Sequence, residues 1–534
     1  MEKLAIELNE DDKLWCQQNN VAPEQFKKVR ELYDGDDSKE RFNQLFGNGQ
    51  ARKDEDKERK QKKKIPIRKY TANGEIPLHE SVVIGSVPKF VTVNNGKVEF
   101  KDDIQAVDAE TVFTPNDTLY TSNPLPYIFE SEPEFRKYFE LSRQESFDSL
   151  FSKVETEFRK YVKVEEHYYT LLVGNTIWSH FQDKFPVTHY VIIVGDNDSG
   201  KNSALLVYRY LGYRVFYVVS ASAPNYYTAF GNREEGQVTI AEDEAQDLPF
   251  DKDKANIMKT GYATGGNVPK VDLDGGRKQD SWLTYGHKWL AMEEIPDHAR
   301  MKGILDRSLV MKFITGEVPN NIKEVIRSAD DPDLKTLFNQ LIHVRKLLFC
   351  FRLLNHSNPI LNIKLNVKNR TAELTKPLIR LFQKSEVKQR ILNDLSKFVI
   401  ERNETRNNSF EAKLYNAIVQ LIKERQKLID ENKLSENEYN LLATHTFSNE
   451  AIRYACQIEM DGNVIEGKDT AFYSPEFGTV SQRRITSTLK SKFKIKSPRL
   501  IRINDQVMRC IEFNQDHFDK IKSKYDVPDR IEIL

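Results

Sequence analysis

The chain has 534 residues, more than a single hydrophobic core usually serves, so we expect several domains. Its 80 Lys and Arg residues balance its 80 Asp and Glu residues, and the net charge of +0 excludes a globally basic nucleic-acid-binding protein. No apolar run approaches the ~20 residues of a membrane span, and the first residues lack the basic and apolar regions of a signal peptide. We therefore expect a cytoplasmic protein with no membrane partner.

The four cysteines are far apart and form no C-x-x-C pair: Cys16, Cys350, Cys456 and Cys510. This pattern argues against a disulfide framework and against a cysteine-ligated zinc ion. We expect free, buried thiols.

Residues 1–64 are predicted to form a helical, charged N-terminal arm and linker. The segment 51–70 holds ten Lys or Arg residues against four Asp or Glu residues and almost no apolar residue, so it cannot belong to a core. A solvated linker and an accessory nucleic-acid-binding arm both fit this composition.

Residues 65–135 are predicted to form a small β module of unassigned function. Asn94-Asn95-Gly96 lies between two alternating apolar stretches, a pattern typical of a β-hairpin. The next segment, 147–181, is predicted to be helical because apolar residues recur at helical spacing: Phe147, Leu150, Phe151, Val154 and Phe158.

A glycine-bracketed loop follows the apolar, β-branched stretch 190–194 and ends on a lysine. In G-x-x-x-x-G-K-[ST] loops, backbone N–H groups surround the β-phosphate, the lysine reaches the β and γ oxygens, and the hydroxyl binds Mg²⁺. Here Asn202 occupies the hydroxyl position. An ordinary strand-to-helix turn is the alternative to the predicted nucleotide-binding residues, which are Gly195, Asp196, Asn197, Asp198, Ser199, Gly200, Lys201, Asn202 and Ser203.

The residues after this loop have the order that the motif requires. Residues 203–211 have helical spacing, and 213–219 are suited to a second buried strand. The stretch 237–245 then predicts a strand that ends in carboxylates, with Asp243 as the Mg²⁺ ligand and Glu244 as the base that polarises water. A shift of one residue would place Glu242 in either role.

Two further features follow. Asp274-Gly275-Gly276 between alternating stretches predicts a hairpin with Arg277 and Lys278 at its tip. Arg307 lies just before the predicted strand 308–313, where ring ATPases place an arginine that reaches the neighbouring subunit's γ-phosphate. A surface ion pair with Asp306 or Asp297 is the alternative for Arg307.

With these motifs, the segment 147–315 resembles the AAA+-type helicase cores of viral and plasmid replication proteins, the superfamily 3 and primase-helicase group, and more distantly MCM. The resemblance implies a Walker A loop over 195–202, a Walker B pair at Asp243 and Glu244, a pore hairpin whose Arg277 and Lys278 touch DNA, and an arginine finger at Arg307. Asn202 and the stretch Met292-Glu293-Glu294, where the family has an asparagine, depart from its pattern.

The C-terminal part divides into a helical segment, 331–430, and a predicted winged-helix domain, 431–534. Helices over 448–460 and 479–493 precede a hairpin over 500–513, the element order of a winged helix. Ile485, Leu489 and Phe493 form the predicted buried stripe. The outward residues, predicted to bind DNA, are Gln482, Arg483, Thr486, Lys490 and Lys494. Docking of a protein partner is the alternative use of such a domain.

The expected fold is therefore a multidomain α/β chain with a P-loop, AAA+-like ATPase domain over 136–330. The leading hypothesis is an ATP- and Mg²⁺-dependent DNA helicase or translocase of a virus or plasmid, of archaeal type. It would assemble as a homo-oligomeric ring, a hexamer, with other replication proteins as further candidate partners. The alternative is a nucleotide-dependent DNA-binding regulator or assembly switch that does not unwind DNA. It is favoured by Asn202 and by the absence of the family's asparagine from Met292-Glu293-Glu294.

Overall fold

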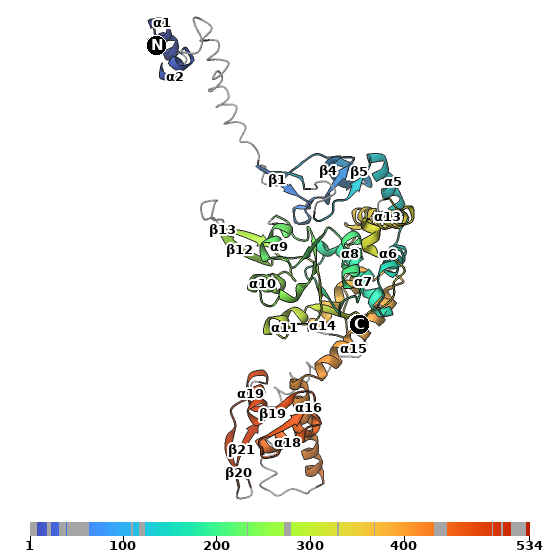
Figure 1. Ribbon diagram of the computed structural model, residues 1–534, viewed down its shortest axis with the longest axis vertical. Helices are drawn as coiled ribbons and strands as arrows, with labels where there is room; N and C mark the ends of the chain where they lie inside the picture. Colours follow the sequence, from blue (N-terminus) through green and yellow to red (C-terminus); the bar gives the residue numbers. More distant parts are fainter. Residues whose placement is uncertain are drawn as a thin grey trace. The chain divides into compact units, whose positions relative to one another are not determined.

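The computed structural model divides the chain into two units, which are described separately below (Figure 1). The first unit comprises Met1–Ile67 and Lys101–Pro115, and the second comprises Arg68–Phe100 and Asn116–Leu534. The structure describes residues 8–18, 23–30, 39, 63–107, 111–116, 123–231, 233–271, 279–327, 330–367, 369–431, 446–493, 495–503, 506–513 and 530–534.

The first unit contains a helical pair and a small sheet. Helices α1 (Glu10–Gln18) and α2 (Pro23–Arg30) bury Cys16 and Phe26 against each other. The strands of the sheet run in the order β1-β7-β6 and are β1 (Lys63–Ile67), β6 (Ile104–Gln105) and β7 (Thr111–Pro115). Residues 40–62, most of the predicted charged linker, lie outside the described residues.

A second small sheet belongs to the second unit. Its strands are β2 (Lys69–Tyr70), β3 (His79–Ile84), β4 (Val87–Asn94), β5 (Lys97–Lys101) and β8 (Ile128–Phe129). The predicted β4–β5 hairpin is confirmed, and its turn residues Asn95 and Gly96 have φ of 49° and 73°. Helices α5 (Glu132–Arg143) and α13 (Pro332–Asn355) bury their apolar side chains against this sheet.

The centre of the second unit is a five-stranded sheet with the order β10-β11-β14-β9-β15. All four strand pairs are parallel, so the carboxyl ends of the strands meet at one edge. The strands are β9 (Tyr190–Val194), β10 (Val215–Val219), β11 (Thr239–Asp243), β14 (Lys288–Met292) and β15 (Ser308–Lys312). A mixed α/β protein with a parallel sheet, as expected, is confirmed.

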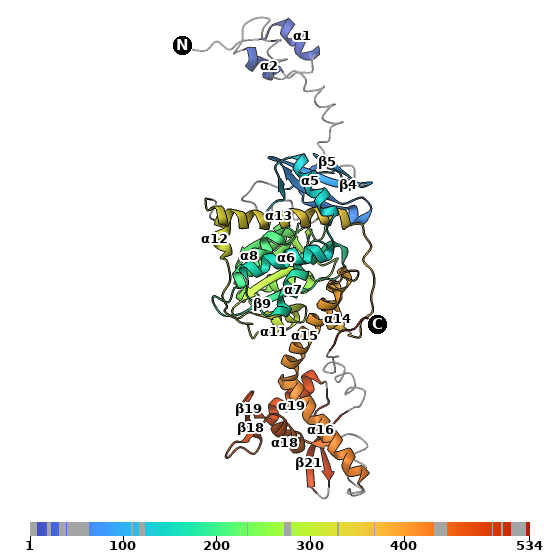
Figure 2. The same ribbon diagram turned by 90° about the vertical axis from the view of Figure 1, so that its right-hand side faces the viewer.

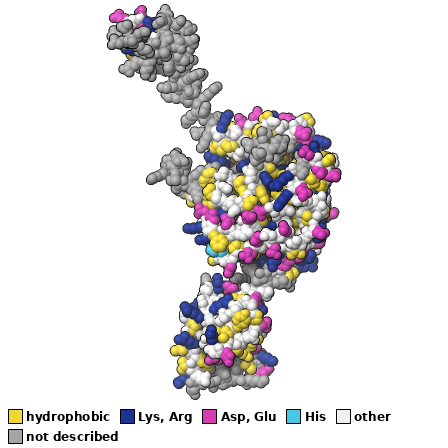
Figure 3. Space-filling view, viewed as in Figure 1, with side chains coloured by type: hydrophobic (Ala, Val, Ile, Leu, Met, Phe, Trp, Pro, Cys, Tyr) yellow, Lys and Arg dark blue, Asp and Glu magenta, His cyan; other side chains and the backbone are white. Residues whose placement is uncertain are grey.

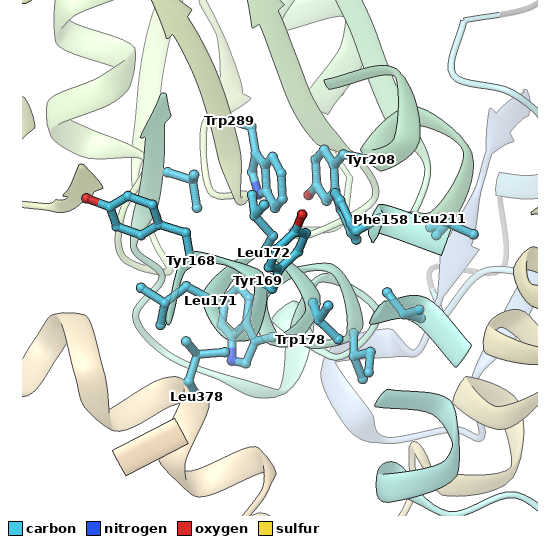
Figure 4. Packing of buried hydrophobic residues seen from close by; sticks show 14 of the residues in the cluster. Phe158, Tyr168, Tyr169, Leu171, Leu172, Trp178, Tyr208, Leu211, Trp289 and Leu378 are labelled. Atoms are coloured by element: carbon cyan, nitrogen blue, oxygen red, sulfur yellow. The ribbon is translucent and has the colours of Figure 1, made fainter. Parts of the chain in front are cut away.

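Helices cover both faces of this sheet, as a parallel sheet requires (Figures 1 and 2). One face packs against α9 (Ala223–Phe230), α10 (Lys252–Thr260) and α11 (Ala299–Leu305). The other face packs against α6 (Phe147–Tyr161), α7 (Glu166–Ser179), α8 (Lys201–Leu211), α12 (Ile322–Arg327), α13, α14 (Asn369–Leu381) and α15 (Lys388–Asn407). In this second core Tyr208 stacks on Trp289 with ring centroids 3.9 Å apart (Figure 4).

The helical prediction for 147–181 is correct in type but wrong in continuity, because two helices share this range. Val162 is extended at the end of α6 (φ −133°, ψ 136°), and α7 starts at Glu166. The intervening Val162-Lys163-Val164 contains two β-branched residues, which favour extended backbone and end the helix.

Strands β12 (Asn267–Val271) and β13 (Gln279–Leu283) pair antiparallel, so the predicted hairpin stems are confirmed. Its tip, residues 272–278, lies outside the described residues.

The C-terminal part forms its own core between Phe410 and Phe513. Its sheets have the orders β16-β21-β20 and β17-β18-β19. The elements are α16 (Phe410–Asp430), β16 (Thr446–Ser448), α18 (Asn449–Glu459), β17 (Asn463–Val464), β18 (Ala471–Ser474), β19 (Gly478–Ser481), α19 (Gln482–Lys492), β20 (Arg499–Ile503) and β21 (Gln506–Glu512).

Several simpler expectations can be checked directly. All four cysteines are free and buried, as predicted. Ile485, Leu489 and Phe493 are buried in the C-terminal core, so the predicted stripe is confirmed. Within the described ranges, no helix combines the length and the apolar composition needed to cross a bilayer.

Candidate nucleotide site

The predicted phosphate loop connects the carboxyl end of β9 to the start of α8. Gly195 is needed because a Cβ atom there would lie 2.5 Å from the Phe313 carbonyl oxygen. Gly200 is needed for a different reason, a left-handed backbone with φ of +87°. Asp198 also has a positive φ, 62°. Such alternation turns successive backbone N–H groups inward and produces an anion-binding concavity.

Lys201 is the first residue of α8, and its side chain folds back over the loop. Its Nζ donates to the Gly195 carbonyl oxygen at 2.5 Å and to the Asp196 carbonyl oxygen at 2.7 Å. The ammonium group therefore lies above the loop at the N-terminus of α8, where the helix dipole favours an anion.

Asn202 contacts Asp243, which ends strand β11. The Asn202 Nδ2 atom donates to Asp243 Oδ2 at 2.6 Å. The Asn202 Oδ1 atom is buried and has no hydrogen-bond partner among the described residues, and the same is true of Ser199 Oγ. An amide oxygen, a hydroxyl and a carboxylate are ligands that Mg²⁺ accepts, so the residues present fit this ion.

Tyr217, on β10, is a residue of this site that the sequence did not reveal. Burial and then the Asp243 carboxylate raise the pKa of Tyr217 to about 12, and its hydroxyl also interacts with the Asn202 side chain. The Arg209 guanidinium lies 5.3 Å from the centre of its ring. Because Tyr217 reaches Asp243 only through the pairing of β10 with β11, no local sequence pattern could have identified it.

The two glutamates that flank Asp243 have different environments. Glu244 is exposed and has a left-handed backbone (φ 57°, ψ 47°), which is strained for a residue with a side chain. Glu242 is fully buried on the opposite face of the sheet, 2.7 Å from Lys254 Nζ, and accepts from the Ala221 N–H at 2.9 Å and from the Tyr226 hydroxyl. Burial acts to lower the pKa of Lys254, but contact with Glu242 outweighs it and raises this pKa. Glu242 therefore holds α10 on the sheet and does not face the loop.

Strand β14 lies between β9 and β11 and ends beside the loop. The Gly195 N–H donates to the Met292 carbonyl oxygen at 3.3 Å, and the two following residues, Glu293 and Glu294, are exposed. The position where the resembling family has an asparagine is thus occupied by carboxylates.

Arg307 lies at the amino ends of the strands of the sheet, whereas the loop lies at their carboxyl ends. It precedes Ser308, which pairs with Tyr190 at the amino end of β9, so a full strand of ~13 Å separates it from Gly195. Its guanidinium lies 4.3 Å from the centre of the Tyr262 ring and donates to the Gly303 carbonyl oxygen at 2.5 Å. In this position Arg307 cannot reach the loop of its own chain. Asp306 instead pairs with Arg402, at 3.4 Å.

The predicted DNA-binding residues are only partly described. Arg277, Lys278 and Lys494 lie outside the described residues. Arg483 and Lys490 are exposed on α19, while Gln482 is half-buried and lies 3.5 Å from the Thr486 hydroxyl.

No protein-family model matches this sequence, and no curated protein matches it. Among solved structures, the C-terminal region of NrS-1 has a TM-score of 0.37 at 9% identity and covers 82% of this chain and 96% of that one. A full-length MCM homolog from Methanopyrus kandleri has a TM-score of 0.26 at 11% identity, and the match covers 60% of this chain and 74% of the homolog. The JCV helicase has a TM-score of 0.21 at 12% identity, and the match covers 55% of this chain and 78% of the helicase chain. Because these TM-scores are low, the function proposed below rests on the residues of the site.

Proposed function

We propose that this chain is an ATP-dependent DNA helicase or translocase that acts in the replication of a virus or plasmid. The observation that supports it most is the pair Asn202 and Asp243, which places an amide oxygen with no hydrogen-bond partner among the described residues beside a carboxylate at the mouth of a glycine loop. A buried oxygen without a partner is costly, and a bound cation would satisfy it.

In this proposal each residue of the site has a defined task. The loop 195–203 surrounds the phosphates, Lys201 leaves its loop carbonyls for the β and γ oxygens, and Asn202 and Asp243 hold Mg²⁺. When bound, Mg²⁺ would neutralise charge on the phosphate oxygens. Glu244, exposed next to Asp243, would orient and polarise the attacking water. Tyr217 would position Asp243.

The position of Arg307 at the opposite edge of the sheet supports sites shared between subunits. If Arg307 acts on a γ-phosphate, that phosphate belongs to a neighbouring copy of the chain, and a closed ring would supply every site with one arginine. We propose a homo-oligomeric ring, with the β12–β13 hairpin toward the DNA.

For the C-terminal part we propose a DNA-binding winged helix. Its element order, helix-strand-helix-helix-hairpin, and its β16-β21-β20 sheet support this, although β17–β19 is an added small sheet. On one face of the β20–β21 hairpin Leu500 pairs with Arg509 and Arg502 pairs with Val507, and all four side chains are exposed. Lys and Arg side chains of this part lie beside apolar ones in Figure 3. Such a surface suits a phosphate backbone and groove.

The ATP site is tested with two variants and two matched controls. Lys201→Ala should abolish binding of a fluorescent ATP analogue, and Glu244→Gln should keep binding but stop phosphate release. The exposed control variants Lys323→Ala and Glu317→Gln should behave as the unaltered chain does. Turnover that persists in both Lys201→Ala and Glu244→Gln would contradict the assignment.

The second candidate function is a nucleotide-dependent DNA-binding switch without unwinding. Asn202 in place of a hydroxyl and carboxylates at the end of β14 favour it, because both change how the γ-phosphate is handled. A forked-duplex assay separates the two functions. Strand release that needs ATP supports the helicase, whereas DNA affinity that changes with ATP without release supports the switch.

A further inference from the structure

Three potential metal-ligating side chains meet where α7 packs against α15. Glu165 occupies the N-cap position of α7 without a capping hydrogen bond from its side chain, His167 lies in the first turn of α7, and Glu401 lies on α15. One donor atom from each residue lies within 4.8 Å of the other two. None of these three residues belongs to the candidate nucleotide site.

His167 is the member that points to a ligand. Its side chain is only 7% exposed, and its Nε2 atom has no hydrogen-bond partner among the described residues. That atom lies 3.0 Å from Glu401 Oε1, an ion-pair distance without the alignment of a hydrogen bond, and the other ring nitrogen, Nδ1, lies 3.5 Å from Glu165 Oε2. Neighbouring donors around one metal ion have this relation, because each is directed at the ion and not at the other. Bonds of ~2.1 Å place adjacent donors ~3.0 Å apart in octahedral geometry and ~3.4 Å apart in tetrahedral geometry.

The surroundings provide support and access. The Tyr168 hydroxyl donates to Glu401 Oε2 at 3.1 Å, the kind of outer contact that orients a metal-binding carboxylate. Figure 4 shows this hydroxyl directed away from the Tyr208–Trp289 stack. A cavity of about 560 Å³ opens over the three residues and is also lined by Glu166, Lys397 and Ile400. It has room for an ion and its water ligands.

We propose that Glu165, His167 and Glu401 bind a divalent transition-metal ion, Zn²⁺ or Mn²⁺, that joins α7 to α15. The imidazole nitrogen disfavours Mg²⁺ and Ca²⁺, which select oxygen ligands, and two carboxylates with one imidazole suit Zn²⁺ and Mn²⁺. Because α15 leads along the chain to α16, the ion would fix the helix that connects the sheet domain to the C-terminal part.

The test measures Zn²⁺ binding to the full, tag-free chain by equilibrium dialysis, in excess Mg²⁺ and without nucleotide, and then repeats it with Mn²⁺. We expect one ion per chain, and an affinity more than about tenfold lower in His167→Gln and in Glu401→Gln. His356→Gln is the matched control, since His356 lies 3.0 Å from Asp183 but belongs to no such group of three within the ranges that the structure describes. It should bind the ion as the unaltered chain does.

A second measurement separates a lost ligand from a lost fold. Hydrogen exchange in α15 should slow when Zn²⁺ is added to the unaltered chain and should not respond in His167→Gln. If a buried-site variant unfolds, Glu165→Gln replaces it, because the Glu165 side chain is 63% exposed and its removal leaves the core intact. Equal Zn²⁺ affinity in the unaltered chain and all three variants, or no binding at all, would overturn the proposal.

Discussion

Asn202 lies in the first turn of α8, where its amide nitrogen donates to Asp243 and its amide oxygen has no hydrogen-bond partner in the described part of the chain. The amide group can therefore donate a hydrogen bond to a carboxylate and bind a cation through its oxygen at the same time. The hydroxyl side chain usual at this position is shorter than that of Asn202. The length of this side chain determines how closely Mg²⁺ and Asp243 can approach the phosphates.

We predict that Asn202→Ala weakens Mg²⁺-dependent ATP binding about tenfold, which corresponds to a loss of about 1.4 kcal/mol in binding free energy. Asn202→Ser restores an oxygen ligand and should hydrolyse ATP at least as fast as the unaltered chain. Mg²⁺ titrations of nucleotide binding and of phosphate release measure both effects. The exposed residue Asn256 provides the control, Asn256→Ala, and an unchanged Mg²⁺ dependence in Asn202→Ala would count against a ligand role.

Which residues of the site could be predicted depended on how locally they are encoded. The loop 195–203 is contiguous, so its glycines and Lys201 are recognisable in the sequence alone. Asp243 was predicted because it ends an apolar stretch. Tyr217 was not, because it joins the site only when β10 and β11 pair in register. The sequence also left open whether Glu242 faces the loop. In the structure, successive side chains of β11 point to opposite faces of the sheet, so Glu242 points away from the face of Asp243.

At the scale of elements, β3 is attached to the rest of its unit by buried charges. Glu80 is fully buried, with its carboxylate 2.9 Å from Arg214 and 2.8 Å from Arg352, and the Tyr213 hydroxyl donates to it at 2.9 Å. Arg352 also contacts Asp183, at 2.9 Å. The apolar stretch of β3 predicted a strand, but partners more than a hundred residues away could not be predicted from it.

We predict that Glu80→Gln lowers the free energy of unfolding by about 3–5 kcal/mol, because it leaves two buried guanidinium groups with less compensating charge. Urea unfolding followed by tryptophan fluorescence measures this. Glu99→Gln on β5, where the carboxylate is exposed, is the control and should change stability by less than about 0.5 kcal/mol. A loss for Glu80→Gln as small as for the control would show that the network contributes little.

At the scale of the whole molecule, buried histidines make stability depend on pH. Burial lowers the pKa of His180 and of His189 to about 3, and it lowers that of His287 as well. In the unfolded chain these groups titrate near the ordinary value of about 6.5, so below that pH the unfolded state binds more protons. Their contribution is complete above about pH 6.5 and is lost as the pH falls toward about 3.

We therefore expect the free energy of unfolding, measured with urea, to decrease between about pH 7 and about pH 5, by up to about 1.4 kcal/mol per pH unit for each of these buried histidines once the pH is below about 6.5. His189→Gln should show a shallower slope than the unaltered chain. Stability that stays constant over this window would mean that water reaches these rings.

Arg307 provides a test of assembly. We predict that Arg307→Ala binds ATP but turns it over slowly, and that Lys201→Ala does not bind it. Because Arg307 lies a full strand away from its own loop, mixing the two variants should restore part of the turnover through mixed assemblies. Mass photometry with and without ATP and Mg²⁺ should show larger species only with nucleotide. Absence of recovery in mixtures that do assemble would remove Arg307 from the site.

The position of Lys201 has a consequence for how a ligand would bind. Its ammonium group is already solvated by the carbonyl oxygens of Gly195 and Asp196. Under the proposed function, Lys201 would exchange these two carbonyl oxygens for phosphate oxygens when a nucleotide binds. Its ammonium group is therefore not a free charge waiting for an anion. The heat gained from the new phosphate contacts would be offset by the two carbonyl contacts given up, and a small anion such as inorganic phosphate would gain little. The loop would in this way discriminate by ligand size, because only a polyphosphate makes enough further contacts to displace the loop's own carbonyl oxygens from Lys201.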